Sequence, residues 1–82
     1  MNDIVIDYAA FTEQSTAYVV MNGLQKTLKV SSDINELAAE LVAICHECSI
    51  HNIKFTGGAP QDTVQQLKEL INDETITIEE LE

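Results

Sequence analysis

Residues 33–48, DINELAAELVAICHEC, have the apolar spacing of an amphipathic α-helix over a longer stretch than any other part of the chain. Asp33 stands where its carboxylate can cap the first turn, and Glu36 follows at the spacing of a capping box. We therefore expect a helix that ends near Ser49 or Ile50 and supports the other elements. One side of it carries the apolar residues Ile34, Leu37, Ala38, Leu41, Cys45 and Cys48.

The segment before this helix has the pattern of a β-hairpin. Two β-patterned runs, residues 16–21 and 24–30, flank Asn22-Gly23, a dipeptide typical of two-residue turns with positive φ. Such a turn fixes the register and predicts the pairs Met21–Leu24, Val19–Lys26 and Ala17–Leu28. The inward position of Lys26 indicates an edge strand protected against pairing with other chains. The predicted core face carries Ala17, Val19, Met21, Leu24, Leu28 and Val30.

The remaining elements are shorter. Residues 3–8 are rich in strand formers, whereas residues 9–15 are small and polar and predict an irregular connection. After the main helix, the pattern predicts a strand at residues 52–56, a helix at residues 61–72 that begins after Pro60, and a final strand at residues 75–78.

These elements predict a single α/β domain of residues 1–82 with the order β-β-β-α-β-α-β. Right-handed crossovers place both helices on one face of a five-stranded mixed sheet if the strand order is 3-2-1-4-5. The other face is then open to solvent and largely polar. Its predicted residues are Val5, Asp7, Tyr18, Val20, Gln25, Thr27, Lys29, Lys54, Thr56, Thr75 and Thr77.

The charge balance restricts the possible partners. Fourteen acidic residues stand against four lysines, and the formal net charge is −10. This balance argues against direct nucleic-acid binding, which draws mainly on Lys and Arg, and against adhesion to anionic membranes. The sequence has neither an apolar run of about 20 residues nor a signal-peptide pattern, so we expect a cytoplasmic protein without membrane contact.

The predicted order and two acidic positions resemble the ribonuclease H-like fold. Members of that family carry an Asp on the first strand, here Asp7, and a Glu in the first turn of the first helix, here Glu36. The resemblance implies Mg²⁺-dependent phosphodiester cleavage at these carboxylates. Gly57 stands where a further Asp is expected, and the pattern predicts no C-terminal helix for the last ligand. The resemblance therefore implies a catalytically degraded member.

Two other motifs could bind a ligand. Cys45, Cys48 and the nearby His51 have a spacing found in zinc sites and redox motifs. Both cysteines lie on the apolar side of the predicted helix, so we expect core thiols without a metal. The residues Thr56, Gly57 and Gly58 lead into a helix N-terminus, where N–H groups can receive an anion, and form either a ligand loop or a tight turn.

We predict a non-enzymatic interaction module that binds a protein partner or a second copy of itself and needs no cofactor. The candidate partner-binding residues lie on the open sheet face: Tyr18, Val20, Lys29 and Lys54. Two alternatives stay open. One is a metal-dependent nuclease-like enzyme that uses Asp7 and Glu36 with Mg²⁺, and the other is an inhibitor whose acidic surface mimics nucleic acid.

Overall fold

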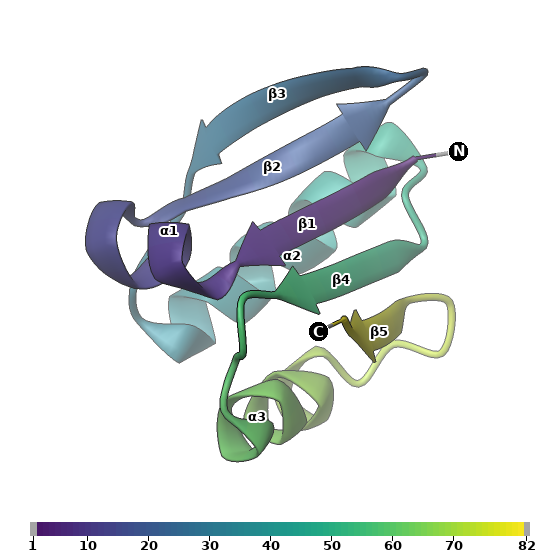
Figure 1. Ribbon diagram of the computed structural model, residues 1–82. Helices are drawn as coiled ribbons and strands as arrows, with labels where there is room; N and C mark the ends of the chain where they lie inside the picture. Colours follow the sequence, from purple (N-terminus) through teal and green to yellow (C-terminus); the bar gives the residue numbers. More distant parts are fainter. Residues whose placement is uncertain (1, 82) are drawn as a thin grey trace.

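The computed structural model describes residues 2–81 and places five strands in one mixed sheet (Figure 1). The strand order β3-β2-β1-β4-β5 confirms the prediction. β1 pairs antiparallel with β2 and parallel with β4, and β2–β3 and β4–β5 complete the sheet. The strands are β1 (Asp3–Asp7), β2 (Thr16–Met21), β3 (Leu24–Lys29), β4 (Asn52–Thr56) and β5 (Thr77–Glu80).

The hairpin between β2 and β3 has the predicted turn and register. Asn22 and Gly23 both adopt positive φ, at 53° and 80°. The pairs Met21–Leu24, Val19–Lys26 and Ala17–Leu28 are all present.

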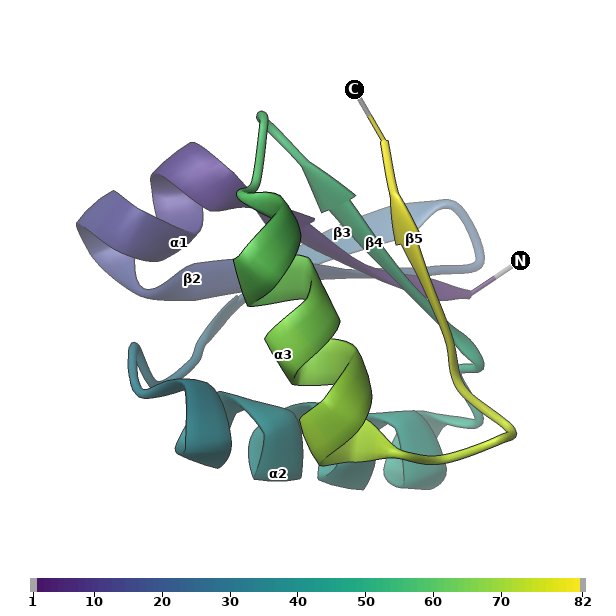
Figure 2. The same cartoon turned by 90° about the horizontal axis from the view of Figure 1, so that it is seen from below.

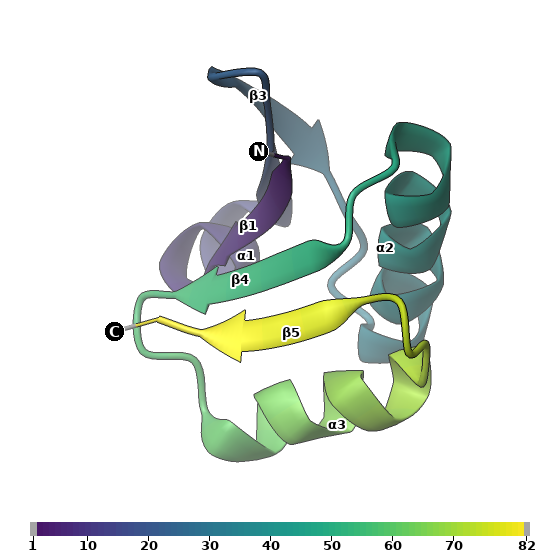
Figure 3. The ribbon, with the colours of Figure 1, turned by 90° about the vertical axis from the view of Figure 1, so that its right-hand side faces the viewer.

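The main helix, α2 (Ile34–Cys48), also forms as predicted. The Asp33 carboxylate accepts the N–H of Glu36 at 3.1 Å, which satisfies one of the free donors of the first turn. Ser49 ends the helix in the left-handed conformation. Helix α3 (Gln61–Ile71) packs beside α2, and both lie on the same face of the sheet (Figures 2 and 3).

Helix α1 (Tyr8–Gln14) replaces the irregular connection expected at residues 9–15, and that prediction was wrong. Asp7 ends β1 and caps α1, because its Oδ1 accepts the Ala9 N–H at 3.3 Å. Phe11 anchors the helix in the core with 7% of its surface exposed. α1 lies at one end of the sheet, beside β1 and β2 (Figure 1).

The final strand begins later than predicted. The N–H and hydroxyl of Thr75 both donate to Asp73 Oδ1, at 2.9 and 2.6 Å, which holds Thr75 in a turn. Pairing with β4 starts only at Asn52–Thr77. Residue Thr75 therefore lies outside the open sheet face on which it was predicted.

The core lies between the sheet and the helices. Its largest fully buried side chains are Phe55, Ile4, Ile6, Leu37, Leu41, Ile50, Ile53 and Leu67. Full burial of each apolar side chain of this size stabilises the fold by roughly 1.5–3 kcal/mol. Within residues 2–81, none of the helices is long and apolar enough to cross a membrane.

Candidate functional site

The two acidic residues of the predicted motif both make local hydrogen bonds. Asp7 caps α1 as described above. Glu36 lies in the first turn of α2 and accepts the hydroxyl of Ser31 at 3.2 Å. Within the part of the chain that the structure describes, no group of three or more His, Cys, Asp or Glu side chains is placed to hold a metal ion. Each of the two carboxylates accepts a hydrogen bond close to a helix N-terminus.

The predicted ligand loop passes directly over the cap of α1. Thr56, the last residue of β4, pairs with Asp7. Gly57 follows with φ +81°, and a Cβ atom there would stand 2.8 Å from Asp7 Oδ1. Gly58 also has a positive φ, at +73°, but a Cβ atom there would meet nothing within 4 Å. The loop is a tight turn whose first glycine permits the contact with Asp7, and a role in ligand binding stays a prediction.

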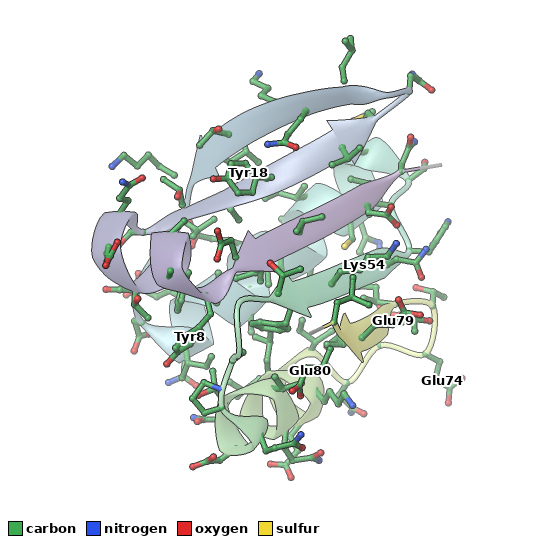
Figure 4. The ribbon with its side chains drawn as sticks, in the orientation of Figure 1. Tyr8, Tyr18, Lys54, Glu74, Glu79 and Glu80 are labelled. Atoms are coloured by element: carbon green, nitrogen blue, oxygen red, sulfur yellow. The ribbon has the colours of Figure 1, made fainter. Side chains whose placement is uncertain are left out.

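The open sheet face carries Tyr18 and Val20 as expected, both half-buried. Figure 4 shows Tyr18 of β2 and Lys54 of β4 on the face opposite α2. Lys54 Nζ lies 3.5 Å from Asp3 Oδ2, and Asp3 is 9% exposed. Lys29 Nζ donates to the Gln14 carbonyl at 3.4 Å. Both predicted partner-binding lysines are therefore engaged within the domain.

The two cysteines face different cavities. Cys45 is buried and, with His51, lines a cavity of about 120 Å³ at the end of α2. Cys48 is half-buried and faces the hairpin. Burial raises the pKa of the Cys45 thiol from 9.0 to about 11, with smaller contributions from Asp73 and Cys48. The Cys45 thiol is thus protonated at neutral pH, which suits the predicted core role.

Asp73 connects the loop before β5 to α2. Its Oδ2 lies 3.0 Å from Nε2 of His46, while its Oδ1 accepts both bonds from Thr75. These bonds, those from Thr75 first, lower the pKa of Asp73 from 3.8 to about 2. At pH values between these two, the Asp73 carboxylate is therefore charged in the folded protein, whereas the same carboxylate in the unfolded chain has already bound a proton.

We expect the stabilisation from Asp73 to be full above about pH 5 and to fall as the pH drops towards 2, because the folded-state pKa is the lower one. Urea unfolding of wild type and Asp73→Ala at pH 6, 4 and 3 would measure it. The difference between the two proteins should shrink with falling pH. A difference that stays constant would show that the charge of Asp73 contributes nothing.

A groove beside the hairpin is the surface that the sequence did not predict. Leu24, expected in the core, is 76% exposed, and Met21 and Leu28 are only half-buried. Two clefts of about 470 and 320 Å³ adjoin here and share Val19, Met21 and Lys26. We call this surface the hairpin groove, and define it by the apolar residues Val19, Met21, Leu24, Leu28, Ile44 and Cys48.

The prediction that Leu24 belongs to the core was wrong, whereas Met21 and Leu28 pack against the core but are only half-buried, because the two helices on this face are too few for five strands. Neighbouring strands lie about 4.8 Å apart, whereas packed helices lie about 8–10 Å apart, so one helix covers roughly two strands. Helices α2 and α3 lie on one face, and the outer strand β3 extends beyond them. Figure 3 shows β3 at the top of the view, with its hairpin end lying farther from α2 than its arrowhead.

Comparisons of the chain with protein-family models, with curated proteins and with solved structures found no match.

Proposed function

We propose that this chain is a non-enzymatic interaction module that binds a protein partner, or a second copy of itself, through the hairpin groove. The exposed apolar face of the hairpin carries the proposal, with Leu24 at 76% exposure as its most accessible side chain. Each Å² of apolar surface removed from water contributes roughly 25 cal/mol. Contiguous apolar surface on a soluble domain commonly marks a contact site.

The groove is a better contact site than the free edge of β3. The side chain of Lys26 lies on the helix-facing side of that edge strand, where it lines both clefts. An inward-facing lysine opposes the addition of another strand, because pairing would bury its charge. A partner that packs onto the face of the hairpin can leave the ammonium group in water while it covers Leu24 and Met21.

We further propose that the domain is a catalytically degraded relative of ribonuclease H-like proteins. The strand order 3-2-1-4-5 supports this, as do the positions of Asp7 at the end of β1 and Glu36 in the first turn of α2. The insertion of α1 between β1 and β2 departs from the expected order. The two alternatives have less support, because Asp7 and Glu36 serve as local hydrogen-bond acceptors and the acidic-mimic idea rests on net charge alone.

Site-specific photo-crosslinking tests the interaction. A photoreactive residue at position 24 should give discrete products in an extract of the native host, or a dimer with purified protein. The matched control is position 70, because Leu70 of α3 is also an exposed leucine, at 41%. Excess wild-type protein should compete for the product, whereas Leu24→Ser should not.

The same competition distinguishes the groove from the open sheet face. A protein with Tyr18→Ser and Val20→Thr should compete as well as wild type, because both residues lie on the other face. Equal products from positions 24 and 70, or none from position 24, would contradict the proposed function. A failure of the Tyr18 and Val20 variant to compete would move the contact to the open face.

A further inference from the structure

We infer that the partner element in the hairpin groove is a basic amphipathic α-helix of another protein, which lies beside α2 on the same side of the sheet. The inference rests on the proposed function and names the class of partner. Three observations support it: the uncovered strand, the shape of the groove, and the charges along its wall.

The layer of helices leaves space for one more helix. Helices α2 and α3 account for about four strands at ordinary packing distances, which leaves the outermost strand β3 without a helix over it. Leu24 and Leu28 lie on the helix-facing side of β3. The neighbouring strands carry their buried core residues on this same side of the sheet. A helix over β3 would extend the existing layer and bury these two side chains.

The groove has the length and lining that a short helix needs. Its floor is the hairpin, with Met21 and Leu24 at one end and Leu28 further along, and its wall is α2, with Ile44 and Cys48. The six residues of β3 span about 20 Å, the length of a helix of about 13 residues. Apolar residues at steps of three and four along such a helix would face both surfaces.

Acidic residues lie along the α2 wall of the groove, whereas Lys26 of β3 is the basic residue that lines both clefts. Glu47 lines the groove directly. Glu36 and Glu40 lie on the same flank of α2, because both accept hydrogen bonds from Ser31, two residues after β3, at 3.2 and 2.7 Å. Lysine or arginine along one side of the partner helix would face these carboxylates. The net charge of −10 attracts a basic partner and repels both a second copy and an anionic membrane.

Synthetic peptides of leucine and lysine provide a direct probe. We would titrate the ¹⁵N-labelled domain, at about 150 mM salt, with a 14-residue peptide whose leucines follow a period of 3.6 residues. Two controls accompany it: a sequence isomer in which leucine and lysine alternate, which favours a strand, and a helical peptide with glutamate in place of lysine. The helical basic peptide should shift the amide signals of Met21, Leu24, Ile44 and Cys48.

Matched variants locate the site. Leu24→Ser should weaken binding of the helical basic peptide by about tenfold or more, because a leucine side chain is no longer buried. Leu70→Ser removes an exposed leucine from α3 and should change the affinity by less than about twofold. Leu24 is exposed in the free domain, so Leu24→Ser should keep the wild-type fold, and its NMR spectrum checks this.

Several results would overturn the inference. Equal or tighter binding of the alternating isomer would indicate an added strand. Signals shifted over the whole acidic surface, with no effect of Leu24→Ser, would indicate attraction by charge alone. A dimer that Leu24→Ser dissociates, without peptide binding, would assign the groove to a second copy. If position 24 gives a crosslinked product but the peptide does not bind, the proposed function stands and the helical partner is rejected. If neither the crosslinked product nor peptide binding is observed, the proposed function and the helical partner are both rejected.

Discussion

Replacing Gly57 with alanine should lower the free energy of unfolding by about 2–3 kcal/mol, as the sum of two costs. The first is backbone strain, because Gly57 has φ +81° and a residue with a Cβ resists that conformation. The second is the contact with Asp7, since the new Cβ would stand 2.8 Å from the Oδ1 that caps α1. The carboxylate must move, and the cap of α1 is weakened or lost.

Gly58→Ala is the matched control, because its φ of +73° carries the same strain while a Cβ there meets nothing within 4 Å. It should cost only about 1–2 kcal/mol in urea unfolding. In an Asp7→Ala background the costs of the two substitutions should come closer together, because only the 3.3 Å approach of the new Cβ to the Tyr8 backbone nitrogen remains at position 57. Equal costs in the wild-type background would show that Asp7 adjusts freely. A stable Gly57→Ala protein that binds its ligand or partner less tightly would favour the ligand-loop prediction instead.

The hairpin and α2 could be predicted from sequence because their determinants are local. Asn22-Gly23 requires positive φ at both residues, and this fixes the register of β2 and β3. Asp33 and Glu36 mark the start of α2. With both elements in place, right-handed connections allow few strand orders, and the observed one follows.

Helix α1 could not be predicted by the same means. It is seven residues long and buries one side chain, Phe11, so no apolar repeat can develop. Its signal is the capping residue Asp7, which in sequence also matches an acid on a first strand. A helix-capping carboxylate and a catalytic carboxylate can occupy the same position in the chain, and only the hydrogen bond to Ala9 identifies the structural task.

The hairpin groove was missed for a different reason. The alternating direction of side chains along β3 correctly indicates which of them face the helices, but it does not indicate whether a helix covers them. Coverage depends on the number of helices relative to strands and on the direction of β3, whose hairpin end lies away from α2 (Figure 3). Counting two crossover helices against five strands was the available signal, and it would have identified Leu24 as the side chain most exposed to a partner.

Phe11→Ala should cost about 3 kcal/mol or more of stability, because truncating a buried phenylalanine removes its apolar contacts and leaves a cavity. Phe11 is the buried residue of α1, and its ring lies 6.4 Å from that of Tyr8. The Phe11 side chain connects α1, whose own hydrogen bonds are local, to the core between the sheet and α2. The helix should therefore exchange its amide hydrogens independently of the rest of the domain once this contact is lost.

Urea unfolding and hydrogen exchange together measure this effect. Thr12→Ala is the control on the same helix, because Thr12 is exposed and its hydroxyl bonds to the Ala9 carbonyl of that helix. It should change stability by less than about 0.5 kcal/mol. Phe11→Leu should recover much of the loss, since an apolar side chain still fills the site. A loss below about 1 kcal/mol for Phe11→Ala, with unchanged exchange in α1, would mean that the cap at Asp7 rather than the buried ring holds the helix.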